Sequence, residues 1–265
     1  MQLITSDTIL RQYITNTMVT VEGETTLFQK MTPELIIAES WFTQNVTPLS
    51  YITGTDLTTI ASKVVACHAF YAAIPQLDLI LTPNGFGIVS NDNVVPASKD
   101  RISSLRDSII ELRDNAIQAL IEQLDKNTVW KASDGKQWRT TLFLGLAAQI
   151  RLKEPNKFDL YNQQLMELVN LESKIGYEYV SQELMTRLRS DDNLSEVEKM
   201  LRTRIQSVEL EYLRDGSFDI PTMDACVVLI RNTPALFAIW EHTPTADHYK
   251  DHTYQNDKSK GGFWI

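Results

Sequence analysis

Residues 63 to 124 carry the clearest pattern of hydrophobic and polar positions in the chain. From Val64 to Ala73 nearly every position is apolar, which predicts a helix covered on several sides. Pro75 is expected to end this helix. From Ile102 to Leu124 apolar residues recur at alternating spacings of three and four, which places one seam along a helix of roughly thirty residues, or about 45 Å. A helix of that length needs a partner along its whole length.

Two short apolar runs surround a Pro83-Asn84-Gly85 turn between these two helices. Extended apolar runs around such a turn predict a small β-hairpin near 77–90. Gly85 and Gly87 do not form a nucleotide-binding loop, because the third glycine of that motif is missing and no helix follows at once.

Start and stop signals predict further helices in the first half of the chain. Thr32-Pro33-Glu34 opens a helix to about Gln44, with Leu35, Ala38 and Phe42 on its inner face. A short helix is expected at 6–14, and Asp56 is expected to cap the helix that ends at Ile74.

The second half of the chain is predicted to be helical as well. Ser195 to Glu198 is a capping box, and its helix is expected to run to about Leu213 before Asp215-Gly216 ends it. Three other helices are expected at 138–150, 160–171 and 178–188, with Gly176 in the connection between the last two.

These patterns together predict a mainly α fold. It is a helical bundle with one long central helix at about 97–127, a small β-hairpin near 77–90 and additional C-terminal helices. We expect two regions, a helical core at 1–130 and a second helical region at 131–265 that ends in an extended tail.

The composition is that of an ordinary globular protein, with 265 residues of which 43% are hydrophobic. The net charge is −9, and the basic residues form no block of the kind that grips nucleic-acid phosphates. An acidic surface would still let DNA pass nearby without holding it. No signal peptide is visible and no apolar run reaches the length of a membrane span, so we expect no membrane partner and assembly in a cytoplasm.

The sequence contains no recognisable catalytic group, so we expect no enzymatic activity and no cofactor. Cys67 and Cys226 are interpreted as reduced packing residues. His248 and His252 are four residues apart, as metal ligands on a helix sometimes are, but their neighbours form no amphipathic helix, so no metal site is predicted.

The charged residues of the long helix mix both signs and leave two interpretations open. They form either a solvated face with internal ion pairs or a subunit contact in a ring, where complementary sides must meet. These residues are Asp100, Arg101, Arg106, Asp107, Glu111, Arg113 and Asp114.

The stretch that holds Phe70 to Asp78, the glycine hairpin, Pro96 to Lys99 and Leu105 to Ser108 resembles proteins of phages and prophages of gut Bacteroidetes. Through these it is similar to the head-to-tail adaptor family of tailed phages, also called neck-ring or head-completion proteins. The resemblance implies a structural virion protein of the phage neck at the head-tail junction, assembled in the host cytoplasm. It implies a homo-oligomeric ring, expected to be a dodecamer, beneath the portal. Such a ring extends the DNA channel, links capsid to tail and acts in viral genome ejection.

The resemblance also implies partners. These are the portal protein, tail or further neck proteins, and duplex DNA that passes through the lumen without tight binding. The last residues fit a docking role: Phe263, Trp264 and Ile265 are apolar anchors after a polar stretch, and Gly261 and Gly262 supply a hinge. The alternative is that this tail packs back on its own subunit.

Two other functions remain open from sequence. One is a cytoplasmic helical binding module or regulator that forms no ring. The other is an enzyme with a pocket between the two halves. The size of the protein in solution separates the first of these from the adaptor.

Overall fold

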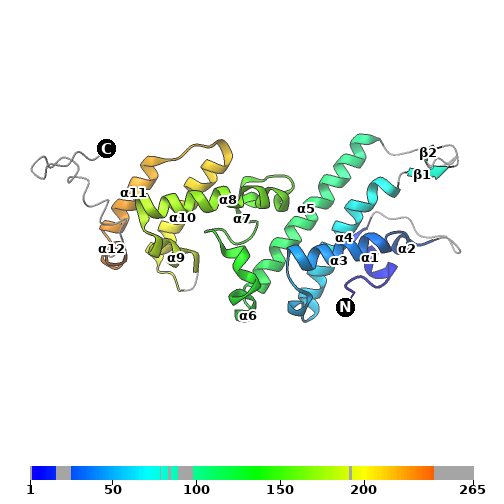
Figure 1. Cartoon of the computed structure of the whole chain (residues 1–265), viewed down its shortest axis with the longest axis horizontal. Helices are drawn as coiled ribbons and strands as arrows, with labels where there is room; N and C mark the ends of the chain where they lie inside the picture. The colour runs from blue at the N-terminus through cyan, green and yellow to red at the C-terminus, as the bar shows by residue number, and fades with distance from the viewer. Residues whose placement is uncertain are drawn as a thin grey trace, which may run out of the picture. The chain divides into compact units, whose positions relative to one another are not determined.

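A computed structural model describes residues 2–15, 25–77, 79–82, 85–88, 98–190 and 193–241. The described chain is mainly helical, as the sequence predicts (Figure 1). It forms two compact units: unit 1 is Met1–Lys136 with Glu154–Phe158, and unit 2 is Gln137–Lys153 with Asp159–Ile265. The predicted regions 1–130 and 131–265 differ from these units at residues 131–136 and 154–158.

Unit 1 is built on two long helices, α4 and α5. Its elements are α1 (Asp7–Tyr13), α2 (Leu27–Lys30), α3 (Thr32–Asn45), the 3₁₀ turn η1 (Leu49–Tyr51), α4 (Thr55–Leu77), β1 (Leu79–Thr82), β2 (Gly85–Ile88), α5 (Lys99–Leu124) and α6 (Thr128–Ala132). The 3₁₀ turn η2 (Asp134–Arg139) begins in unit 1 and ends in unit 2.

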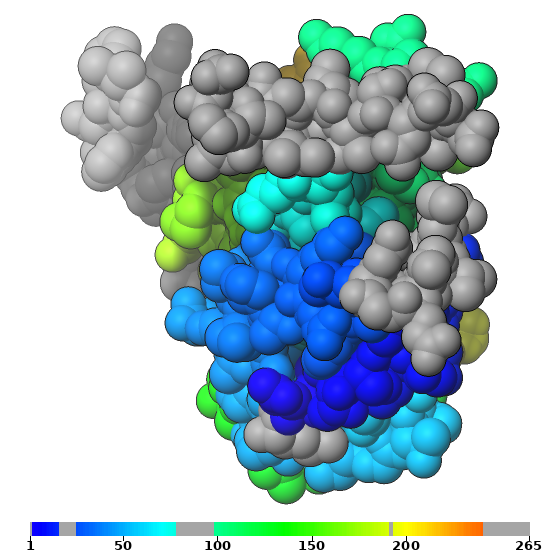
Figure 2. All heavy atoms as spheres, turned by 90° about the vertical axis from the view of Figure 1, so that its right-hand side faces the viewer, coloured from blue at the N-terminus to red at the C-terminus, as the bar shows by residue number. Residues whose placement is uncertain are grey.

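Both α3 and α5 pack against α4. α4 is buried on several sides, as its near-continuous apolar run predicts, and its buried residues include Val64, Cys67 and Phe70. On α3 the predicted inner face of Leu35, Ala38 and Phe42 is confirmed as buried. Figure 2 shows α1 to α3, in blue, across the face of unit 1 that turns toward the viewer.

α4 is long and apolar enough to cross a membrane, so the sequence expectation that no stretch reaches such a length is wrong here. The helical segments Ile220–Arg231 and Pro234–Trp240 reach such a length only when this bent pair is taken as one span. Half of the most apolar stretch of α4 is buried inside the protein. A core helix of a globular domain has the same length and composition.

Two predicted limits of α4 are also wrong. The helix begins at Thr55, so Asp56 lies in its first turn and does not cap it. It continues through Pro75 to Leu77, because a proline near the end of a helix removes only one backbone hydrogen bond.

α5 is the predicted long central helix, and its observed bounds are Lys99–Leu124. Its first turn is capped by Ser98, whose hydroxyl accepts a hydrogen bond from the Arg101 backbone N–H at 3.4 Å. β1 and β2 pair antiparallel, with Leu79 opposite Ile88 and Thr82 opposite Gly85. The rest of the region expected to form the hairpin near 77–90 is Leu77, which ends α4, and positions outside the described residues.

Unit 2 is a bundle of shorter helices around one apolar cluster. Its elements are α7 (Ala147–Leu152), α8 (Lys157–Ile175), the π-helix η3 (Gly176–Val180), α9 (Gln182–Ser190), α10 (Glu196–Asp215), α11 (Ile220–Arg231) and α12 (Pro234–Glu241). α8 begins in unit 1 and continues in unit 2. The capping box at Ser195 and the end of α10 before Gly216 are both confirmed.

Gly176 does not lie in a connection between two helices as predicted, because the chain continues from α8 directly into the π-helix. A Cβ at Gly176 would lie 2.6 Å from the side-chain nitrogen of Gln182, so no larger residue fits without a shift. The π-helix ends at Ser181, which is buried and has a φ of 107°. This backbone region is costly for a residue with a side chain.

The predicted helix at 138–150 is wrong over most of its length. Helix α7 begins only at Ala147, and Gly145 has a φ of 58° that ends any helix before it. The backbone of Leu142 bonds to other helices instead: its N–H donates to Glu172 and its carbonyl accepts from Arg202 and Gln206. These distant partners replace the local hydrogen bonds of a helix.

Candidate docking surface

The outer face of α3 leaves two neighbouring isoleucines in water. Ile36 is 55% exposed and Ile37 is 64% exposed. Single exposed apolar residues are common on protein surfaces, but adjacent ones beside a hollow mark a place where another molecule can pack.

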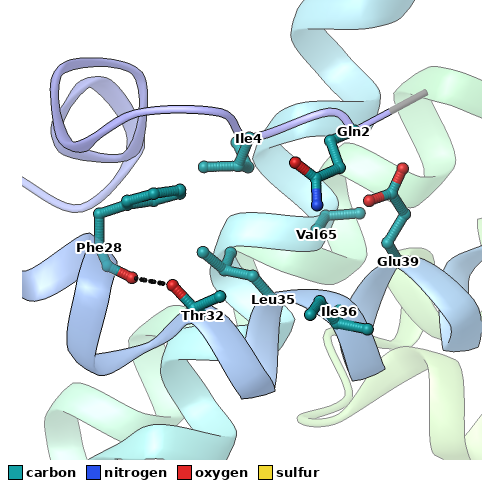
Figure 3. A pocket seen from close by; sticks show the side chains of 8 residues that line it. All are labelled: Gln2, Ile4, Phe28, Thr32, Leu35, Ile36, Glu39 and Val65. Atoms are coloured by element: carbon teal, nitrogen blue, oxygen red, sulfur yellow. Dashed lines mark hydrogen bonds between the residues drawn. The ribbon is translucent and has the colours of Figure 1, made fainter.

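A hollow lies next to these isoleucines between α3, α4 and the start of the chain (Figure 3). Its volume is about 70 Å³, whereas pockets for small-molecule ligands commonly measure about 300–1,000 Å³. The hollow is therefore suited to part of a partner's side chain rather than to a cofactor. Its lining is mostly apolar, with Gln2, Thr32 and Glu39 as the polar members, and comprises Gln2, Ile4, Phe28, Thr32, Leu35, Ile36, Glu39 and Val65.

Glu39 places a carboxylate at the edge of this hollow, where Figure 3 shows it facing Gln2. Its Oε1 atom is buried without a hydrogen-bond partner in the described structure, and so is Oε2 of Glu34, five residues earlier on α3. Burial raises the pKa of Glu39, although a hydrogen bond from the Leu3 backbone N–H opposes the shift. A buried carboxylate oxygen that lacks a donor, such as Oε1 here, is stabilised by a cationic or hydrogen-bonding partner.

We name Glu34, Ile36, Ile37, Glu39 and the adjoining hollow the α3 surface. Reasoning from sequence missed it, because the stripe of Leu35, Ala38 and Phe42 had already supplied an inner face for this helix. The available signal was the pair of isoleucines outside that stripe.

A buried polar cluster lies in unit 1 around Arg113 and Asp114 of α5. Arg113 is 4% exposed and Asp114 is fully buried, and Arg113 Nη2 lies 2.8 Å from Asp114 Oδ1. Neither sequence interpretation of these two charges holds, because they form neither a solvated face nor an exposed subunit contact. The expected mixed-charge face remains at Asp100, Arg101 and Asp107, which are exposed.

Aromatic rings cover this cluster. The Trp41 ring stacks on His68 with their centroids 3.8 Å apart, and the Arg113 guanidinium lies 5.5 Å from the Trp41 centroid. Burial, together with the nearby Arg113 charge, lowers the pKa of His68 to about 4. His68 is half-buried and lies beside Arg113, whose ion pair with Asp114 is buried, so the cluster joins α3, α4 and α5.

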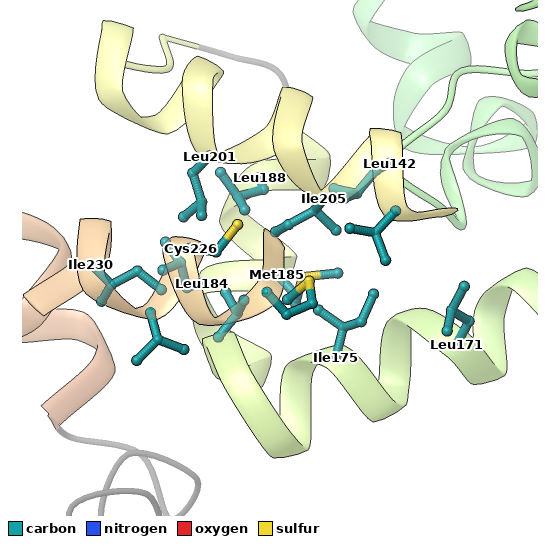
Figure 4. Close-up of a cluster of buried hydrophobic side chains, with 14 of the residues drawn as sticks. Leu142, Leu171, Ile175, Leu184, Met185, Leu188, Leu201, Ile205, Cys226 and Ile230 are labelled. Atoms are coloured by element: carbon teal, nitrogen blue, oxygen red, sulfur yellow. The ribbon is translucent and has the colours of Figure 1, made fainter. Parts of the chain in front are cut away.

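Unit 2 contains a second buried polar pair, Glu172 and Glu209, beside its apolar cluster. Leu171 precedes Glu172 on α8, and Ile205 lies one turn before Glu209 on α10. Figure 4 shows both of these apolar side chains directed into the cluster. Glu172 accepts hydrogen bonds from the Leu142 backbone N–H at 2.5 Å and from Arg189 Nε at 2.7 Å.

Glu209 has no such donors: neither of its side-chain oxygens has a hydrogen-bond partner in the described part of the chain. Burial and the charge of Glu172 raise the pKa of Glu209 well above its usual value. Glu209 therefore keeps a proton that it can share with Glu172. Both side chains are fully buried.

A shallow depression of about 440 Å³ also lies on unit 2, over α8 and α10. Its one cation, Lys174, already lies 5.0 Å from the centre of the Phe218 ring and 4.0 Å from a carboxylate oxygen of Glu178. The cation of this depression is therefore already engaged, and the other charged residue of its lining, Glu167, is an exposed carboxylate.

The tail residues predicted to dock on a partner, Phe263, Trp264 and Ile265, lie outside the described residues, as do the hinge glycines Gly261 and Gly262 and the histidine pair His248 and His252. Elsewhere, no group of three or more His, Cys, Asp or Glu side chains in the described ranges could hold a metal ion. Cys67 and Cys226 are free and buried, as predicted, and burial raises the pKa of each thiol to about 11.

Comparison with known proteins gives one match. Residues 20–140 are similar to a family described as a family of unknown function, DUF6712. This segment includes α3, α4 and α5. No curated protein and no solved structure matches the chain.

Proposed function

We propose that this protein is a structural virion protein of a tailed phage, a subunit of the head-to-tail adaptor ring beneath the portal. In this role it extends the DNA channel, links capsid to tail and has no enzymatic activity. The small hairpin near 77–90 is part of this proposal, as an element at the end of the long helices.

The observation that carries the proposal is the α3 surface. Two isoleucines more than half exposed, a hollow too small for most ligands and one carboxylate oxygen each of Glu34 and Glu39 without a partner among the described residues support a contact with another subunit. A ring supplies the missing partner at every subunit, because the same pair of surfaces meets at each interface. The mainly helical fold with a long central helix fits the same role.

The partners in this proposal follow from the resemblance and from charge. The portal protein lies on one side of the ring and tail or further neck proteins on the other, with no membrane involved. Duplex DNA passes through the lumen, and a net charge of −9 keeps it from binding tightly. DNA binding by the purified protein should be weak at physiological salt, and tight binding with a steep salt dependence would count against this passage.

Sedimentation of the purified protein tests the proposal. The wild type should form a closed oligomer, and the double variant Ile36→Ser/Ile37→Ser should sediment as a single chain with unchanged helical content. These side chains are exposed, so their loss should change the free energy of unfolding of one subunit by only about 0.5 kcal/mol. If the wild-type protein stays monomeric at every concentration, with and without added portal protein, the ring is refuted and the cytoplasmic binding module is favoured.

A further inference from the structure

We infer that the α3 surface binds the first turn of α5 of the neighbouring copy, so that Glu39 and Glu34 meet Lys99 and Arg101. This inference rests on the proposed ring and specifies which surfaces form its subunit contact. The occupant of the α3 surface is therefore a second copy of this chain.

The acidic side of the contact has unused acceptor oxygens in the single subunit, although Glu39 also accepts a hydrogen bond from the Leu3 backbone N–H. Glu39 Oε1 and Glu34 Oε2 are buried and have no hydrogen-bond partner among the described residues. Lysine and arginine supply several N–H donors on a long apolar stem. Such a side chain can lay its stem along Ile36 and bring its charge to Glu39.

The basic side of the contact lacks carboxylate partners in the single subunit. Lys99 and Arg101 are exposed, and neither side chain pairs with a carboxylate of the described residues. Both lie in the first turn of α5, where the partial positive charge of the helix end disfavours cations. Asp100 offsets only one of them. Carboxylates from a neighbour would relieve this repulsion.

Apolar side chains accompany the charges on both sides. Ile102 and Leu105 follow Arg101 on α5 and are only partly buried. They can cover Ile36 and Ile37, whose exposure would otherwise persist in the ring. A contact with an apolar centre and a charged rim is typical of specific protein interfaces.

Both surfaces belong to unit 1, which is one compact body. In Figures 1 and 2 α5 begins at the top of this unit, whereas α3 lies in its lower half. A surface cannot reach its complement within the same subunit when the two are separated in this way. Such a pairing can repeat head to tail from copy to copy, and a fixed rotation between copies then closes it into a ring.

Charge reversal tests the contact through complementation. Variant A carries Glu39→Lys, and variant B carries Lys99→Glu with Arg101→Glu. Each alone places like charges together, so we expect its self-association to weaken by roughly tenfold or more. An equimolar mixture of A and B restores opposite charges at every interface of an even-numbered ring, and a chain with all three substitutions does so as well. Both should assemble like the wild type.

Two controls keep the result interpretable. Glu183→Lys reverses an exposed carboxylate on α9 and should leave assembly unchanged. Glu39→Gln keeps the shape of the side chain, and thermal unfolding of each variant reports whether the subunit still folds. If A does not fold, the comparison of Glu39→Gln with B carries the test: both should weaken assembly if the contact is correct.

Three outcomes are decisive. Loss in A and B with recovery in the mixture supports the contact. If variants A and B each form the same rings as the wild type, this contact is wrong and the adaptor proposal is unaffected. A wild type that forms no oligomer alone or with portal protein overturns both.

Discussion

Asp114 on α5 accepts a hydrogen bond at 3.1 Å from the backbone N–H of Phe158, which lies 44 residues later in the first turns of α8. The first N–H groups of a helix have no partner inside the helix, so Asp114 supplies one from another element. Its other oxygen, Oδ1, binds the Arg113 guanidinium. One buried carboxylate thus fixes the start of α8 on unit 1 and neutralises a buried cation.

Replacement of Asp114 by alanine should strongly destabilise unit 1. It leaves the Arg113 charge buried without a counter-ion and the Phe158 N–H without its acceptor. Breaking a buried pair in this way costs about 3–5 kcal/mol of folding free energy. Urea unfolding measures the loss.

The matched control is Asp107→Ala on the same helix. Asp107 is exposed, so its removal should change the unfolding free energy by no more than about 0.5 kcal/mol. Equal stability of the Asp114 and Asp107 variants would show that the tie to Phe158 is unimportant.

The stability of the protein should fall as the pH decreases from about 6.5 toward 4, in part through His68. Burial lowers the folded-state pKa of His68 to about 4 from a usual value of 6.5. Between these values the unfolded chain binds a proton that the folded chain excludes, so acid favours unfolding. His68→Phe keeps the stack on Trp41 and should flatten this part of the pH profile. An unchanged profile in the variant would mean that His68 is not excluded from protonation.

Titration of Glu209 should change the stability of the protein with pH in the direction opposite to that of His68. Its pKa is raised in the folded state, so its contribution is complete below the usual value of 4.5 and is lost as the pH rises through the folded-state pKa. Glu209→Gln removes this titration and still offers an N–H to Glu172. The variant should therefore be more stable than the wild type at neutral and alkaline pH and lose that advantage near pH 4 and below. A Glu209→Gln protein that unfolds more easily than the wild type at pH 8 contradicts the shared proton.

The sequence predicted the features whose causes are local. The seam of α3, the capping box at Ser195 and the end of α10 before Gly216 each depend on a few neighbouring residues, and all three are confirmed. The expected helix at 138–150 failed because Glu172 and Gln206 take the backbone groups of Leu142. No local pattern predicts hydrogen-bond partners that lie 30 and 64 residues away in the sequence.

The candidate site was harder to predict than the fold. Arg113 and Asp114 look like surface charges in a helical pattern, since their burial depends on Trp41, His68 and Phe158 from three other segments. The α3 surface was not predicted because its apolar residues look buried but are exposed. Ile36 and Ile37 look like core residues, and only packing reveals that they are more than half exposed in the described part of the chain.

Removal of residues 261–265 should separate folding from assembly. Phe263 and Trp264 belong to a segment proposed to dock on an adjacent ring protein, in the first place the portal, with Gly261 and Gly262 as the hinge. Aromatic anchors concentrate binding energy when they fill a pocket. Thermal unfolding of the shortened chain should match that of the full chain, while its incorporation into particles should be lost. Normal incorporation refutes the docking role, and a large drop in thermal stability favours a tail that packs on its own subunit.

Electron microscopy of the purified protein, alone and mixed with portal protein, tests the central claim most directly. The account predicts closed rings with a central opening wide enough for duplex DNA, built from repeated contacts that the Ile36→Ser/Ile37→Ser variant abolishes. Images that contain only single 30.2 kDa chains under both conditions would contradict it.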